Sequence, residues 1–131
     1  MTTEMKHKLP HFTVNVLGTT YTVYLGSYID LGMKETVDGD CEVMSKTIRL
    51  RTDMKEDWDG DKSLLTKYVR QVLIHELAHA FFFESGMLDY FDDERLIEWL
   101  EVNATKLVST AQIGGDTLLA CLAALDSPSD S

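Results

Sequence analysis

The sequence predicts a single α+β domain in which a small antiparallel β-sheet precedes two longer helices and a short third one. Apolar and polar residues alternate in the first half of the chain, which is the period of strands with one buried face. In the second half, apolar residues recur at helical spacing. The length of 131 residues, with 44% hydrophobic and 26% charged residues, suits one folded domain. We expect that domain to span residues 1–126, with residues 127–131 as a disordered tail.

Two pairs of strands are expected before the helices. Residues 12–25 contain FTVNV and YTVYL around the turn signal LGTT, a pattern typical of a β-hairpin. The second extended pair runs through MKETV, turns at DGD, continues through CEVM and ends in TIRLR. The first half of the protein is therefore predicted to be a small antiparallel sheet.

The first long helix is predicted over residues 64–85. Its apolar positions repeat at helical spacing, and Gly86 is a favourable stop. Asp61 or Ser63 is available as its N-cap, at the end of an acidic connection.

The second helix is predicted over residues 93–110, after a loop that contains MLDYFDD. Gly114 and Gly115 are expected to end this helical region. Asp116 would then cap a short apolar helix, TLLACLAAL.

Charge and composition exclude several classes of partner. The formal net charge of −10 repels nucleic acid and anionic membrane surfaces. The N-terminus lacks the apolar run of a signal peptide, and we expect no segment long enough to cross a bilayer. A cytoplasmic protein with no nucleic-acid or membrane partner is therefore expected. Cys41 and Cys121 are interpreted as reduced, packed thiols.

The motif HELAH, residues 75–79, lies within the first long helix. Residues four apart on a helix share a face, so His75 and His79 can direct two imidazoles at one metal ion. Glu76 projects about 100° around the helix from His75, where it can reach a metal-bound water. This spacing indicates two zinc ligands and one general base.

A catalytic zinc site needs a third protein ligand. His7 and His11 precede the sheet, and we expect both to be exposed residues outside the site. Three carboxylates lie along one flank of the second helix, and helical phase alone does not choose among them: Glu94, Glu98 and Glu101.

An HExxH helix followed by a glutamate-bearing helix resembles the gluzincin metallopeptidases. The small size and the preceding β-strands resemble the ImmA/IrrE-type and related phage-encoded members, which often carry E-x-x-[AV]-[ND]-x-[FIL]-A after HExxH. This chain has ERLIEWLE at residues 94–101. The resemblance implies that Glu94 is the third ligand and that Glu98 supports a ligand histidine. Glu98 and Glu101 depart from the family pattern, and both stay open as alternative ligands.

The resemblance implies a zincin-like fold, bound Zn²⁺ and a zinc endopeptidase that acts on a specific protein or peptide substrate. Glu76 would be the general base on the zinc-bound water. The substrate would lie extended along the edge of the sheet, and Tyr68 and Tyr90 are candidate oxyanion donors. The alternative is a catalytically silent zinc-binding module that binds a partner protein.

Overall fold

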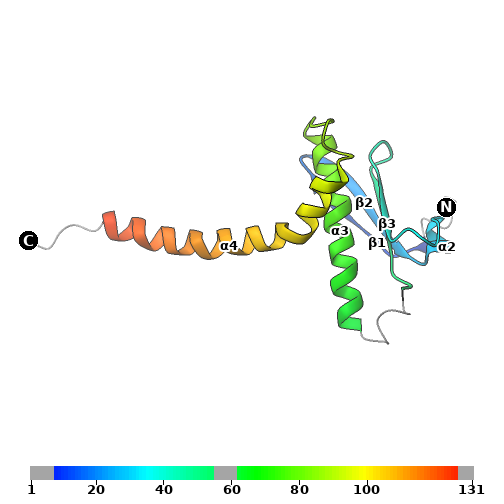
Figure 1. Ribbon diagram of the computed structural model, residues 1–131, viewed down its shortest axis with the longest axis horizontal. Helices are drawn as coiled ribbons and strands as arrows, with labels where there is room; N and C mark the ends of the chain where they lie inside the picture. The colour runs from blue at the N-terminus through cyan, green and yellow to red at the C-terminus, as the bar shows by residue number, and fades with distance from the viewer. Residues whose placement is uncertain (1–7, 55–61, 127–131) are drawn as a thin grey trace, which may run out of the picture.

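In the computed structural model, which describes residues 8–54 and 62–126, a four-stranded sheet is covered on one face by a long helix, and a second long helix crosses the first (Figure 1). The predicted α+β class is confirmed. The predicted tail at residues 127–131 lies outside the described residues. The strands are β1 (His11–Val16), β2 (Thr19–Gly26), β3 (Gly39–Glu42) and β4 (Thr47–Arg51), and the helices are α2 (Tyr28–Leu31), α3 (Lys62–Glu84) and α4 (Glu94–Asp126).

The sheet has the strand order β1-β2-β4-β3 and is mixed rather than purely antiparallel. The hairpin predicted over residues 12–25 is present, and β3 and β4 form a second antiparallel pair. However, β2 and β4 are parallel neighbours, with Thr22 opposite Thr47. The central pairing therefore corrects the expected antiparallel arrangement.

The cause of the parallel pairing is the segment after β2. The Ser27 side chain accepts a hydrogen bond from the Asp30 amide and caps α2, and Gly32 ends this helix with a φ of 71° in the left-handed region. The segment MKETV then forms turns, where a strand was predicted. The chain thereby crosses over before β3 and brings β4 alongside β2.

The core lies between the sheet and α3. Val23 and Ile48 of the sheet are fully buried, and they belong to one cluster with Val72 and Ala80 of α3. Alternate residues of β2 and β4 enter this cluster, which is why the two-residue period was visible in the sequence. The sheet thus fixes the position and rotation of α3, which carries the HELAH motif.

The predicted bounds of α3 are close to the observed ones. Gly86 has a φ of 79°, and the Met87 amide donates to the Phe82 carbonyl while the Gly86 amide donates to Phe83, as in a Schellman motif. Ser63 is the second residue of the helix instead of its N-cap. The other expected cap, Asp61, lies outside the described residues.

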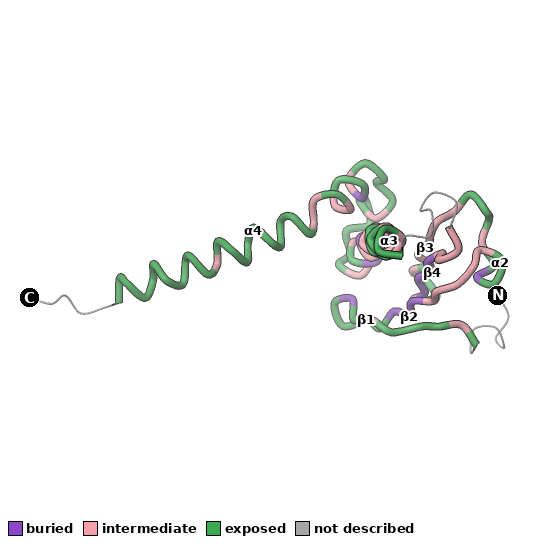
Figure 2. Tube along the Cα trace, turned by 90° about the horizontal axis from the view of Figure 1, so that it is seen from below, coloured by how far each residue is buried: buried purple, intermediate pink, exposed green. Residues whose placement is uncertain are grey.

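Helix α4 is continuous to Asp126, so the predicted break at Gly114 and Gly115 is wrong. Neither glycine adopts the left-handed conformation that ends α2 and α3. Only Ile97 of this helix is buried, and from Val102 onward α4 extends away from the sheet as a mostly exposed arm (Figures 1 and 2). We call residues 102–126 the arm.

Many large apolar side chains of the arm are exposed, including Leu118 at 57% and Leu125 at 79%. By length and composition alone, α4 is long and apolar enough to cross a membrane, and its most apolar stretch has no buried residue. The expectation that no segment reaches this length is therefore corrected.

Candidate metal centre

Three side chains with metal-ligand chemistry meet where α4 begins beside α3. The Nε2 atom of His75 lies 3.2 Å from one carboxylate oxygen of Glu94, and the Nε2 atom of His79 lies 3.3 Å from the other. The potential ligand atoms of all three residues lie within 4.8 Å of one another. The structure therefore brings together the two histidines of the motif and the first of the three glutamates.

A short connection places Glu94 at this point. After Gly86 the chain reverses, and the Phe91 ring packs edge-on against Phe83 of α3 at a centroid distance of 5.7 Å. Asp93 then caps α4, because its side chain accepts a hydrogen bond from the Leu96 amide at 3.3 Å. Glu94, the first residue of α4, is thus held over the histidines by packing on one side and a cap on the other.

The outer nitrogen of each imidazole faces a hydrogen-bond acceptor. The Nδ1 atom of His75 lies 3.2 Å from the Glu101 carboxylate, and the Nδ1 atom of His79 is hydrogen bonded to the Phe91 carbonyl. A carbonyl oxygen only accepts, so the proton of neutral His79 belongs on Nδ1. Its Nε2 lone pair then faces the Glu94 carboxylate.

Two lone-pair atoms that face each other at this distance repel unless a cation lies between them. Zinc ligands lie about 2.0–2.2 Å from the ion, so two ligands in a tetrahedral shell are roughly 3.3–3.5 Å apart. The separations of 3.2 and 3.3 Å between the histidine nitrogens and the Glu94 oxygens are close to that spacing. The residues present fit a bound metal ion.

Glu76 lies beside this cluster with an exposed fraction of only 6%. Burial raises the pKa of Glu76 to about 7, although the charge of His75 lowers it. No group in residues 8–54 or 62–126 donates a hydrogen bond to its carboxylate. A buried carboxylate without a donor is costly unless the site supplies one, such as a water or a substrate group.

Two cavities meet at Gly39, His75 and Glu76. The first has a volume of about 250 Å³ and is also lined by Asp38, Tyr68, Val72 and Glu101. The second has a volume of about 290 Å³ and is also lined by Asp40, Cys41, Val43, His79, Phe91, Asp92 and Glu94. The first cavity and the second cavity together form a cleft between α3 and strand β3.

Gly39 allows β3 to approach α3 closely enough to form this cleft. A Cβ atom at this position would lie 2.6 Å from Cγ1 of Val72 and 3.0 Å from the Arg49 carbonyl oxygen. Any other residue would push the strand away from the helix.

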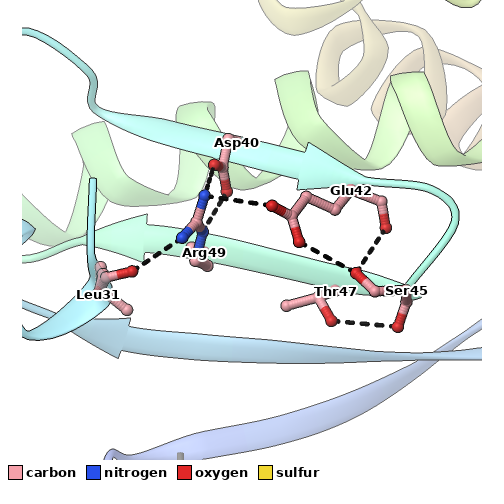
Figure 3. Close-up of polar contacts among 6 residues, drawn as sticks. All are labelled: Leu31, Asp40, Glu42, Ser45, Thr47 and Arg49. Carbon is pink, nitrogen blue, oxygen red and sulfur yellow. Dashed lines mark hydrogen bonds and ion pairs between the residues drawn. The ribbon is translucent and has the colours of Figure 1, made fainter. Parts of the chain in front are cut away.

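Arg49 fixes the acidic side chains of the neighbouring hairpin (Figure 3). Its Nε atom donates to Asp40 at 2.8 Å, and Nη1 donates to the Leu31 carbonyl at 2.9 Å. The hydrogen bond to Asp40 raises the pKa of Arg49. Glu42 lies 3.6 Å from the same guanidinium and also accepts a hydrogen bond from Ser45 at 3.1 Å. Asp40 therefore lies at the second cavity with its charge paired.

The structure differs from the expected supporting role of Glu98. The Glu98 side chain is exposed, and Glu101 occupies the place beside His75. Seven residues on a helix amount to almost two turns, so Glu101 lies within about 20° of Glu94, whereas Glu98 is rotated by about 40° to the other side. With Glu94 fixed over both histidines, Glu101 is the glutamate that reaches the outer nitrogen of His75.

The two tyrosines and the remaining histidines occupy different surroundings. The Tyr68 hydroxyl lies at the first cavity and donates to Asp38, while Tyr90 is 46% exposed and packs against Phe82 at 6.4 Å. His11 begins β1 and is hydrogen bonded to the Leu9 carbonyl. His7 lies outside the described residues.

Sequence reasoning missed the contribution of Asp38 and Asp40. Aspartate and glycine are frequent in turns, so the segment DGD predicts only a turn. The available signal was a glycine between two acids at the start of a strand and ahead of an HExxH helix. In the structure, these acids line the first and second cavities.

A family model for zincin-like metallopeptidases matches residues 11–99. No curated protein and no solved structure gives a match. The matched part contains all four strands, α3 and the start of α4, and therefore the metal-ligand cluster and every residue that lines the cleft except Glu101. It covers more than half of the 131 residues, and the chain therefore belongs to the zincin-like metallopeptidase family.

Proposed function

We propose that this protein is a zinc-dependent endopeptidase that hydrolyses a peptide bond in a specific protein substrate. One observation carries the proposal: the buried Glu76 carboxylate, which accepts no hydrogen bond from the described residues, lies beside three convergent ligand atoms of His75, His79 and Glu94. A closed structural metal site would need four protein ligands and no such base.

His75, His79 and Glu94 would hold the ion. When bound, zinc acts as a Lewis acid, which polarises the scissile carbonyl and makes a water molecule a better nucleophile. Glu76 accepts the proton of the attacking water and passes it to the leaving amine. Glu101 and the Phe91 carbonyl keep each imidazole proton on Nδ1, so that both Nε2 atoms stay available as ligands.

Strand β3 supports an extended substrate. It lies at the edge of the sheet, paired with β4 on one side, and its other side borders the cleft. A peptide that adds to this edge would bind through main-chain hydrogen bonds. Its scissile bond would then pass Gly39, the residue at which the two cavities meet.

The test is a comparison of new protein N-termini in cells that express the parent, Glu76→Gln or Glu98→Gln. Glu76→Gln removes the base while nearly keeping the shape, so cleavage should fall by about 10²–10⁴-fold. Glu98→Gln makes the same chemical change at an exposed position of α4 and should cleave as the parent does.

Metal analysis of the purified proteins accompanies this comparison. Zinc should be present at one ion per chain in the parent and in Glu76→Gln, and absent from His75→Ala. Identical N-termini in parent and Glu76→Gln cells, with zinc in both proteins, would overturn the proposed catalysis and leave a binding role.

A further inference from the structure

The first cavity has walls of two kinds. Tyr68 and Val72 of α3 provide an aromatic and an aliphatic surface, and Asp38 and Glu101 provide carboxylates. Its volume of about 250 Å³ is large enough for one long side chain, and it opens beside Glu76. A side chain with an apolar stem and a polar end would match both walls.

Each of these two carboxylates is held in place through one of its own two oxygens. Asp38 accepts a hydrogen bond from the Tyr68 hydroxyl through Oδ2, and Glu101 faces His75 through Oε2 at 3.2 Å. Glu76 also lines this cavity; it is more than nine-tenths buried, and no residue in the part of the chain that the structure describes donates a hydrogen bond to it. No lysine or arginine is among the residues that line it. Its one imidazole, His75, faces Glu94 and Glu101, so the carboxylates that line the first cavity outnumber its basic side chains.

The second cavity differs in this respect. There, Asp40 is paired with Arg49, and Glu94 faces the two histidines. Among residues 8–54 and 62–126, Asp38 forms no ion pair. The nearby Arg51 interacts with it through charge alone and donates its hydrogen bonds to Asp53 at 2.5 Å and to the Glu35 carbonyl. The excess of carboxylates over cationic side chains in the cleft thus lies in the first cavity, on the side of Asp38.

We propose that the first cavity binds a lysine or arginine side chain of the substrate, next to the scissile bond. This inference rests on the proposed peptidase function. The alkyl stem would pack against Tyr68 and Val72, and the cationic end would reach the second carboxylate oxygens, Oδ1 of Asp38 and Oε1 of Glu101. A neutral side chain of equal length would gain the packing alone.

The first test is cleavage of a proteome digested with a glutamate-specific protease, which leaves internal lysines and arginines intact. The zinc-loaded parent should cut with basic residues enriched at one of the two positions that flank the scissile bond. A lysine peptide should be cut with a kcat/KM about 10- to 100-fold above its norleucine counterpart, as expected for one charged hydrogen bond.

Two matched variants locate the preference. Asp38→Asn keeps an acceptor for Tyr68 but removes the charge, and should reduce the lysine rate to the norleucine rate. Asp92→Asn makes the same change in the second cavity and should keep the preference. Cleavage without basic enrichment, or enrichment that survives Asp38→Asn, would overturn the inference and leave the peptidase function standing.

Absence of any cleavage would instead overturn the proposed function, and binding then decides the inference. Calorimetry would use the zinc-loaded, full-length Glu76→Gln variant and two hexapeptides. One peptide contains a single lysine among alanines, and the other contains a single norleucine in its place. The lysine peptide should bind about 10- to 100-fold more tightly, and Asp38→Asn should abolish the difference. Equal affinities would overturn the inference without reference to activity.

Discussion

Glu98 and Glu101 lie within one turn of α4, yet their side chains meet different surroundings. Glu101 is hydrogen bonded to His75, and Glu98 is exposed. An acceptor on Nδ1 orients a ligand imidazole and makes it a better ligand, so Glu101→Ala should weaken zinc affinity by about 10–100-fold. Competition with a chromophoric chelator would measure the change.

Glu98→Ala is the matched control for that experiment and should bind zinc as the parent does. If Glu98→Ala loses affinity and Glu101→Ala keeps it, the assignment from the hydrogen bonds is wrong. Circular dichroism of both variants would establish that the fold is retained.

The two cysteines should differ in reactivity. Burial, reinforced by the charges of Glu76, Asp40 and Glu42, raises the pKa of Cys41 to about 12. At pH 8 this shift leaves roughly a thousandfold less thiolate than an ordinary thiol would have. Iodoacetamide should therefore label only exposed Cys121 in the native protein, as read by peptide mass spectrometry.

In guanidinium chloride, both thiols should react at similar rates, because unfolding removes the surroundings that protect Cys41. Rapid native labelling of Cys41 would show that β3 does not stay packed against α3.

For single residues, the sequence predicted which side chains of one helix share a face, but not which side chains of two different helices meet. The shared face of His75 and His79 follows from helical geometry alone, because both residues lie on one helix. The choice among Glu94, Glu98 and Glu101 depends on how α4 crosses α3, and the loop of residues 85–93 sets that crossing. No periodicity in the sequence encodes it.

Among the elements, glycines have opposite effects in two places. Gly86 ends α3 in the left-handed conformation, whereas Gly114 and Gly115 lie within α4 with open space around each Cβ position. In both places, glycine at a possible helix end is the signal in the sequence. Only at Gly86 does the tight reversal of the chain toward α4 require a positive φ. This is why residue type alone predicted one helix end correctly and the other wrongly.

Gly114→Ala should stabilise the arm. Alanine in a helix interior is favoured over glycine by about 0.5–1 kcal/mol, and nothing lies within 4 Å of the new methyl group. Amide hydrogen exchange in residues 108–120 should slow by about two- to fivefold, as measured by mass spectrometry.

Gly86→Ala provides the contrasting change, because its φ of 79° strains an alanine. It should lower the free energy of unfolding by about 1–2 kcal/mol. For the Gly114→Ala variant, amide hydrogen exchange in the arm that is faster than in the parent would indicate that the arm is not helical in solution.

For the whole molecule, the sequence predicted which segments are strands better than how they pair. Alternation identified the hairpin and β4, because each strand buries one face. The parallel neighbours β2 and β4 arise from a crossover whose direction depends on α2, a helix of four residues without a periodic signal. The class could be predicted, but the order of strands could not.

Removing most of the arm should leave the fold and the metal centre intact. The only buried residue of α4 is Ile97, and the site residues of this helix end at Glu101. A chain that ends at residue 106 should match the full chain in midpoint of thermal unfolding and in zinc affinity. A chain that ends at residue 93 lacks Glu94 and Glu101 and should lose zinc. We expect the midpoint to fall by more than a few degrees only in the chain that ends at residue 93. The same fall in the chain that ends at residue 106 would assign the arm a stabilising role.

The 33 residues of α4 correspond to a rod about 50 Å long, most of which stands clear of the sheet (Figure 1). A projecting rod increases the friction on a tumbling molecule by more than its share of the mass would. The frictional coefficient of the 14.8 kDa chain must therefore exceed that of a sphere of equal mass. The elution volume in gel filtration would therefore depend more on the projecting helix than on the number of chains in the particle. Light scattering, which gives the molar mass of the particle independently of its shape, is the appropriate measure of its oligomeric state.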